Sequence, residues 1–169
     1  INYYGKTKLA AENICAQSNV QFAIVRTMWL YGHQLTPKLN FLQWLHQELS
    51  EGRPVNIVND EFGNPTLLQD FIYAIYKVIS KDISGIIHIS GDERMSRLEF
   101  AYRIADQFKL DSKLIRSVSN AELGRPAQRP LQSGLLTLKA KSMIDLEMRP
   151  LKHSLMIAQT MKRRWENIG

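Results

Sequence analysis

Along most of the chain, segments in which hydrophobic residues have helical spacing alternate with short apolar runs typical of strands. This pattern predicts an α/β fold. The N-terminal segment has helical spacing, and a short apolar run at 20–25 follows it, interrupted only by Gln21. Such a run is typical of a strand buried on both faces of a parallel sheet. A helix that leads into a buried strand is half of a doubly wound unit, in which ligands collect beyond the carboxyl ends of the strands.

Downstream, the alternation repeats with recognisable helix starts. Asn40 and Gln43 are placed as a capping pair before a helix in the forties, and residues 55–58 have strand character. Thr66 and Gln69 have the spacing of a capping box that opens the next helix. The apolar residues of that helix are Phe71, Ile72, Ile75 and Ile79.

The second half begins with the same alternation and then loosens. Residues 86–89 indicate a strand, and Ser96 with Glu99 indicates another capped helix. Pro and Gly interrupt the pattern from residue 111 to 150, which predicts a loop-rich cap before a final helix at about 151–165. We therefore expect the C-terminal part of a Rossmann-like doubly wound parallel sheet plus a small mixed α/β substrate-binding cap.

Composition supports a globular protein and excludes several classes. The chain has 169 residues, 44% of them hydrophobic, and one cysteine, so no intramolecular disulfide is available and a reducing, cytoplasmic location is expected. No apolar run approaches a membrane span. The formal charge of +6 comes from dispersed Lys and Arg, which favours a small anionic substrate over nucleic acid. The histidines lack metal-ligand spacing, so no metal site is expected.

The N-terminal segment offers a candidate reactive pair. In a helix, Tyr4 and Lys8 lie one turn apart on the same face. A positive charge beside a phenol favours the phenolate form, which suits proton transfer near neutral pH. Two residue types at this spacing also recur by chance, so the rest of the chain has to decide whether the pair is functional.

Several further motifs occur together and in order. With them, the chain resembles the dTDP-4-dehydrorhamnose reductases of the extended short-chain dehydrogenase/reductase superfamily. The matching segments are Tyr4-Gly5-Lys6-Thr7-Lys8-Leu9, Arg26-Thr27-x-Trp29-Leu30-Tyr31-Gly32, Asn40-Phe41, Gly63-Asn64-Pro65-Thr66, the segment 85–91, Glu99-Phe100-Ala101 and Arg129-Pro130-x-x-Ser133-x-Leu135.

The resemblance implies a role for the reactive pair. Tyr4 would give a proton to the C4 oxygen of a nucleotide-linked 4-keto sugar while a nicotinamide delivers hydride to the carbon. Lys8 would bind the nicotinamide ribose and support the tyrosine electrostatically. Thr27, just past the predicted strand, would lie beside the nicotinamide. Tyr4, Lys8 and Thr27 are thus the expected cofactor contacts, and NADP or NAD is the expected cofactor.

The resemblance also implies substrate-binding residues. Trp29 would stack against the substrate, and Asn40 and Arg129 would contact its diphosphate, although Trp29 could equally fill the core and Arg129 could equally position the cap.

Three positions depart from the family. Ala11 stands where glycine is frequent, which should matter little at a helix contact. Met28 replaces a commonly small polar residue, and Glu61 stands where glutamine is frequent, so we expect its charge to repel a diphosphate.

Family members begin with a glycine-rich loop that cradles the dinucleotide pyrophosphate, and this sequence has no such loop. We therefore expect a C-terminal portion: residues 1–32 as a remnant of the dinucleotide-binding domain and 33–169 as mainly substrate-binding, with some segments returning to the sheet. By itself it should be inactive. The family also suggests magnesium and a homodimer. The alternatives are a nucleotide-sugar epimerase or dehydratase, or a regulatory subunit resembling methionine adenosyltransferase beta.

Overall fold

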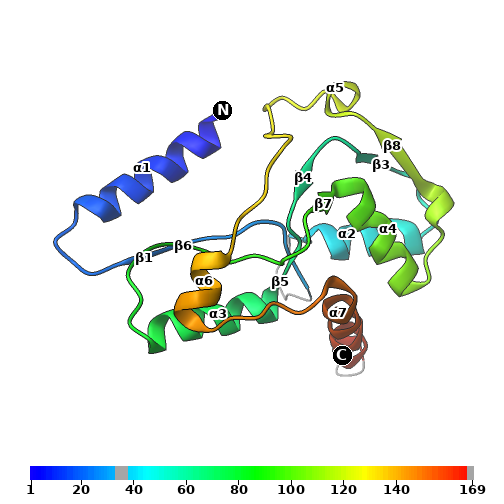
Figure 1. The fold of residues 1–169 in the computed structure, drawn as a ribbon. Coiled ribbons are helices and arrows are strands. Elements are labelled where there is room, and N and C mark those ends of the chain that lie inside the picture. Colours follow the sequence, from blue (N-terminus) through cyan, green and yellow to red (C-terminus); the bar gives the residue numbers. More distant parts are fainter. Residues whose placement is uncertain (33–37, 167–169) are drawn as a thin grey trace.

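One group of elements surrounds a pair of parallel strands. The computed structural model describes residues 1–32 and 38–166, in which β1 (Ala23–Arg26) pairs in parallel with β6 (Gly85–His88). Helix α1 (Tyr3–Gln17) lies on one side of this pair, and α3 (Leu68–Ser80) and α6 (Leu138–Ile144) lie on the other (Figure 1). This arrangement is that of a doubly wound sheet with helices on both faces.

A second group lies beside the first and contains the larger core. Here β3 (Val55–Val58) pairs in parallel with β8 (Ile115–Val118), and the helices are α2 (Phe41–Ser50), α4 (Arg97–Phe108) and α7 (Leu151–Glu166). Helix α4 packs against both α2 and α7, so it forms the centre of this group (Figure 1).

Short elements connect the two groups. Strand β2 (Leu30–Tyr31) pairs in parallel with β5 (Thr66–Leu67), and β4 (Phe62–Gly63) pairs antiparallel with β7 (Met95–Ser96). The remaining elements are the 3₁₀ turn η1 (Ser112–Leu114) and the short helix α5 (Asn120–Leu123). The chain after α5 descends past the N-terminal end of α1 to α6 (Figure 1). None of the helices in the described ranges is long and apolar enough to cross a bilayer.

Each group has its own buried apolar cluster. The smaller cluster joins α3 and α6 to β6 and includes Ala74, Val78, Ile87 and Ile89. The larger cluster lies between α2, α4 and α7, and Phe100 at its centre is fully buried and contacts the ring of Tyr31 edge-on. The predicted fold class, with parallel strands in a mixed α/β fold, is confirmed.

The cap of α2 is as predicted. The Asn40 side chain accepts a hydrogen bond from the Gln43 backbone N–H at 3.1 Å, and the Gln43 side chain accepts one from the Asn40 N–H at 3.3 Å. These two bonds satisfy donors that the first turn of a helix otherwise leaves unpaired. Ser96 likewise caps α4 by accepting a hydrogen bond from the Glu99 N–H at 3.0 Å.

The prediction of a capping box at Thr66 is wrong. Thr66 lies in β5, and α3 begins only at Leu68 with no side-chain cap. The Thr66 hydroxyl instead donates to the carbonyl of Asn64 at 3.1 Å and accepts from the Gly91 N–H at 3.2 Å. The Thr66 hydroxyl is therefore used by the neighbouring chain segment at Gly91 and not by α3, which the spacing of Thr66 and Gln69 cannot reveal.

Two other predictions need correction. The first strand spans Ala23–Arg26 and not 20–25, and it is not buried on both faces, since Ala23 is exposed and its other residues are partly exposed. The segment 111–150 is also more regular than predicted, because it contributes β8 and α6. In α3, Ile72 and Ile79 are 57% and 72% exposed, and Ala74 and Val78 face the sheet.

Candidate functional site

The N-terminal end of α1 carries the predicted reactive pair. Lys8 Nζ lies 5.5 Å from the centre of the Tyr4 ring, so the helix brings the two side chains together as the spacing requires. The Tyr4 side chain is accessible, with the residue 68% exposed. Asn2 caps this helix by accepting a hydrogen bond from the Gly5 N–H at 2.9 Å, and its amide donates to the Gln128 carbonyl at 2.7 Å.

Helix α1 has no buried residue, so polar contacts hold it in place. The main one is the ion pair between Arg26 at the end of β1 and Glu12, whose carboxylate accepts two hydrogen bonds, one of them at 2.8 Å. Hydrogen bonding from Arg26 lowers the pKa of Glu12, and the carboxylate raises the pKa of Arg26 in return. This pair links the helix that carries Tyr4 and Lys8 to the end of β1.

Thr27 follows β1 directly, where ligands of doubly wound sheets collect. Its hydroxyl oxygen is buried and has no hydrogen-bond partner among the described residues. Buried polar groups are nearly always paired, and an unpaired one costs free energy. The Thr27 hydroxyl is therefore available to a polar group of a bound ligand.

Trp29 packs against the core and contacts Arg97. Its backbone is left-handed, with φ of 47°, and its indole stacks against Phe100 with ring centres 6.4 Å apart. The guanidinium carbon of Arg97 lies 3.6 Å from the centre of the Trp29 ring and 4.6 Å from the centre of the Phe41 ring. The two aromatic rings hold the guanidinium by cation–π contacts.

Arg97 lies at one side of an open cavity of about 270 Å³. Aromatic side chains and three arginines shape this cavity. Its lining residues are Phe41, Trp44, Asn56, Ile57, Val58, Glu61, Arg97, Arg125 and Arg129. The combination of flat rings and guanidinium groups suits a ligand with both an aromatic base and anionic phosphate groups.

Glu61 forms ion pairs with two of the three arginines that line the cavity. Its carboxylate lies 2.7 Å from Arg125 Nη1 and 3.5 Å from Arg97 Nη2. Burial lowers the pKa of Arg97 to about 10, against the opposing influence of Glu61. Arg129 forms no ion pair within the described part of the chain, so its charge is available to a ligand.

The predicted substrate residues thus have different surroundings. Arg129 lines the cavity. Trp29 does not line it but contacts Arg97, which does. Asn40 does not line it, since its amide caps α2 and donates to the Gly32 carbonyl at 2.6 Å. Arg97 and Arg125 were not predicted. The sequence does contain a signal for Arg97. A cation at the first position of a helix is unfavourable beside the positive end of the helix dipole, so its presence there indicates another role.

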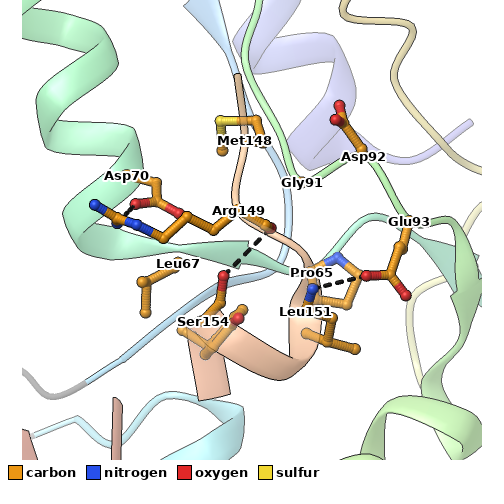
Figure 2. Close-up of a pocket in the computed structure, with 11 residues that line it drawn as sticks. Pro65, Leu67, Asp70, Gly91, Asp92, Glu93, Met148, Arg149, Leu151 and Ser154 are labelled. Atoms are coloured by element: carbon orange, nitrogen blue, oxygen red, sulfur yellow. Dashed lines mark hydrogen bonds and ion pairs between the residues drawn. The ribbon is translucent and has the colours of Figure 1, made fainter. Parts of the chain in front are cut away.

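A second cavity is far smaller. It holds about 10 Å³ where the chain enters α7, with Arg149 paired to Asp70 and Glu93 accepting from the Leu151 N–H at 2.7 Å (Figure 2). Burial raises the pKa of Asp70, and Arg149 opposes that shift. A space of this size admits one water at most, so these contacts fasten the final helix and do not bind a substrate.

Comparison with known proteins identifies the family. The family described as "RmlD substrate binding domain" matches residues 1–163. The chain belongs to this family. The dTDP-4-dehydrorhamnose reductase of Sinorhizobium fredii is 30% identical over 145 residues, which cover 80% of this chain and 48% of that protein. Methionine adenosyltransferase 2 subunit beta of Bos taurus is 28% identical over 141 residues, which cover 80% of this chain and 42% of that protein.

Solved structures of the family have the same fold. The dTDP-4-dehydrorhamnose reductase of Bacillus anthracis, in complex with NADP, superimposes with a TM-score of 0.86 at 28% identity. The match covers 94% of this chain and 55% of that one. The chain thus spans about half the length of the relatives it matches. Its resemblance to the dTDP-4-dehydrorhamnose reductases is confirmed.

The described residues contain no cluster of potential metal-ligating side chains. Within residues 1–32 and 38–166, no three His, Cys, Asp or Glu side chains lie close enough together to ligate one ion.

Proposed function

We propose that this chain supplies the proton donor and the substrate pocket of an NAD(P)H-dependent reductase acting on a nucleotide-linked 4-keto sugar, of the dTDP-4-dehydrorhamnose type. The observation that carries the proposal is the Tyr4–Lys8 pair, with the ammonium 5.5 Å from the centre of the phenol ring on an accessible helix face. The family membership and the Bacillus anthracis reductase with NADP support it.

The roles follow from the chemistry of these side chains. A bound nicotinamide supplies hydride to the C4 carbon of the sugar. The Tyr4 hydroxyl gives its proton to the C4 oxygen, and the Lys8 ammonium stabilises the tyrosinate that remains. The unpaired hydroxyl of Thr27 fits a polar group of the nicotinamide end of the cofactor. The residues present therefore suit the reactive end of the cofactor.

The arginine-lined cavity is the proposed substrate site. Arg125 and Arg129 would hold the diphosphate, and Phe41 and Trp44 would pack against the nucleoside. We further propose that residues 1–32 belong to the dinucleotide-binding side and 33–169 mainly to the substrate side, with β6 and α3 returning to the sheet. The β1–β6 pair and the α3 packing beneath it support this division.

The decisive test is Tyr4→Phe in a full-length protein that contains this sequence. Removing the proton donor should lower kcat for keto-sugar reduction by about 10²- to 10⁴-fold. Tyr3→Phe is a matched control, since Tyr3 is the neighbouring tyrosine and is also exposed, and this variant should leave turnover unchanged. Full turnover by Tyr4→Phe would remove Tyr4 from the mechanism.

A second test concerns the chain alone. We expect the 169-residue chain to show no turnover and no tight dinucleotide binding, because it lacks a glycine-rich phosphate loop. NADPH binding at about micromolar affinity would contradict this expectation.

A regulatory subunit is the second candidate, and the similarity to the bovine beta subunit favours it. It predicts a stable complex with a partner enzyme and no keto-sugar reduction by the full-length protein. Co-purification with mass spectrometry, beside an NADPH-consumption assay, separates the two functions. An epimerase or dehydratase would regenerate its cofactor, so it would turn over its nucleotide sugar without net NADPH consumption.

A further inference from the structure

The charge of the proposed substrate cavity is set by four side chains. Arg97, Arg125 and Arg129 each contribute a positive charge, and Glu61 contributes the one negative charge, so the lining carries a formal charge of +2. Asn56 and the remaining lining residues are uncharged. A ligand whose phosphates carry two negative charges would neutralise this cavity.

Glu61 is held in place at both ends. Its backbone carbonyl accepts a hydrogen bond from the Arg97 N–H at 2.8 Å, and its carboxylate lies 2.7 Å from Arg125 Nη1. The residue is only 8% exposed, so the carboxylate cannot turn out to solvent without leaving its partners. Glu61 thus remains in the cavity as a fixed negative charge.

We infer that Glu61 makes this cavity select a diphosphate diester, as in a nucleotide-linked sugar, over the free nucleoside diphosphate. This inference rests on the proposed function. A diphosphate diester carries a charge of about −2, whereas a free nucleoside diphosphate gains a further charge when its terminal phosphate ionises near pH 6. With Glu61 present, the cavity matches the charge of the diester. Without it, the cavity would match the free nucleoside diphosphate.

This role differs from simple repulsion of the substrate. The Glu61 charge is already paired with Arg97 and Arg125, so a diester meets an ordered arginine cluster and not a lone carboxylate. The additional charge of a free nucleoside diphosphate has no counter-charge left in the cavity and lies close to the Glu61 carboxylate. At such short range in a partly solvated site, one unit charge changes affinity by about tenfold.

The test is isothermal titration of this chain with dTDP-glucose and with dTDP, at a pH well above the phosphate ionisation near 6. The wild-type chain should bind dTDP-glucose at least as tightly as dTDP. Glu61→Gln should shift the ratio of the two dissociation constants about tenfold toward dTDP. Glu61→Asp keeps the charge and should keep the wild-type preference.

A matched control is Glu99→Gln, the same chemical change on α4. The Glu99 side chain is about half exposed and pairs with Arg103 at 3.1 Å, outside the cavity, so the ratio should not change. Arg125→Gln provides a second variant in case Glu61→Gln does not fold. It removes a positive charge and should weaken dTDP more than dTDP-glucose.

The outcomes separate the two proposals. If the wild-type chain binds neither ligand, the proposed substrate site is wrong and the inference falls with it. If it binds both and Glu61→Gln leaves the ratio unchanged, or weakens both equally, the inference about selectivity is overturned and the substrate site stands.

Discussion

Replacing Thr27 by valine should stabilise this chain, although it removes a proposed cofactor contact. The Thr27 hydroxyl oxygen is buried and unpaired among the described residues. Leaving such a group without a partner costs about 1–3 kcal/mol, and valine has the same shape without the hydroxyl. For a chain of this size, 1 kcal/mol changes Tm by about 2–4 °C. We therefore expect Thr27→Val to raise Tm by several degrees.

Thr66→Val is the matched control for this experiment. Thr66 is fully buried, and its hydroxyl donates to the Asn64 carbonyl and accepts from the Gly91 N–H. Removing it leaves the Asn64 carbonyl and the Gly91 N–H without this partner, so this variant should lose about 1–3 kcal/mol. Calorimetric scans of the two variants beside wild type should give Tm shifts of opposite sign.

The second half of the experiment uses the full-length protein. There, Thr27→Val should raise the dissociation constant for the cofactor by about 2- to 10-fold, the value of one hydrogen bond. A Thr27→Val chain that loses stability as Thr66→Val does would show that the hydroxyl already has a partner. Stabilisation without any loss of cofactor affinity would mean that the cofactor does not use it.

Two further predictions concern the surroundings of the site. Gly63→Ala should lose about 1–3 kcal/mol in denaturant titration, because the new methyl would lie 2.6 Å from the Trp29 indole; unchanged stability would show that the indole moves freely. The pKa of Glu12 is lowered by Arg26, so the contribution of this pair is present above the ordinary value of about 4.3 and is lost as pH falls through the lowered value. Hydrogen exchange of α1, corrected for intrinsic rates, should therefore lose part of its protection in acid in wild type, and Glu12→Gln should show that reduced protection at every pH.

Local signals in the sequence predicted those helix caps whose hydrogen bonds are also local. The cap formed by Asn40 and Gln43 depends on residues three apart, so the pattern contains all the information needed. The Thr66 hydroxyl bonds to Gly91, which is 25 residues away, and the same pattern therefore gave a wrong prediction. Strand β8 was missed because Arg116 and Ser117 are polar and exposed, so the strand lacks the apolar run that marked the others.

The candidate site shows the same limit. Tyr4 and Lys8 could be paired from the sequence because a helix brings residues four apart together. The arginine cluster comes from the start of α4 and from the loop after α5, and no spacing in the sequence relates Arg97 to Arg125 or to Glu61. The family resemblance identified Arg129 alone. Only the fold reveals that Glu61 is paired and enclosed.

The weak attachment of α1 to the rest of the chain bears on the proposed roles of Tyr4 and Lys8. Proton transfer requires the Tyr4 hydroxyl to be held within a few tenths of an ångström of its productive position. Helix α1 buries no residue, and its contacts with the rest of the described chain include the Glu12–Arg26 pair and the bond from Asn2 to Gln128. Exposed polar contacts of this kind contribute little and open easily. The proposed role of Tyr4 as proton donor therefore predicts that a full-length protein containing this sequence holds α1 more rigidly than this chain does.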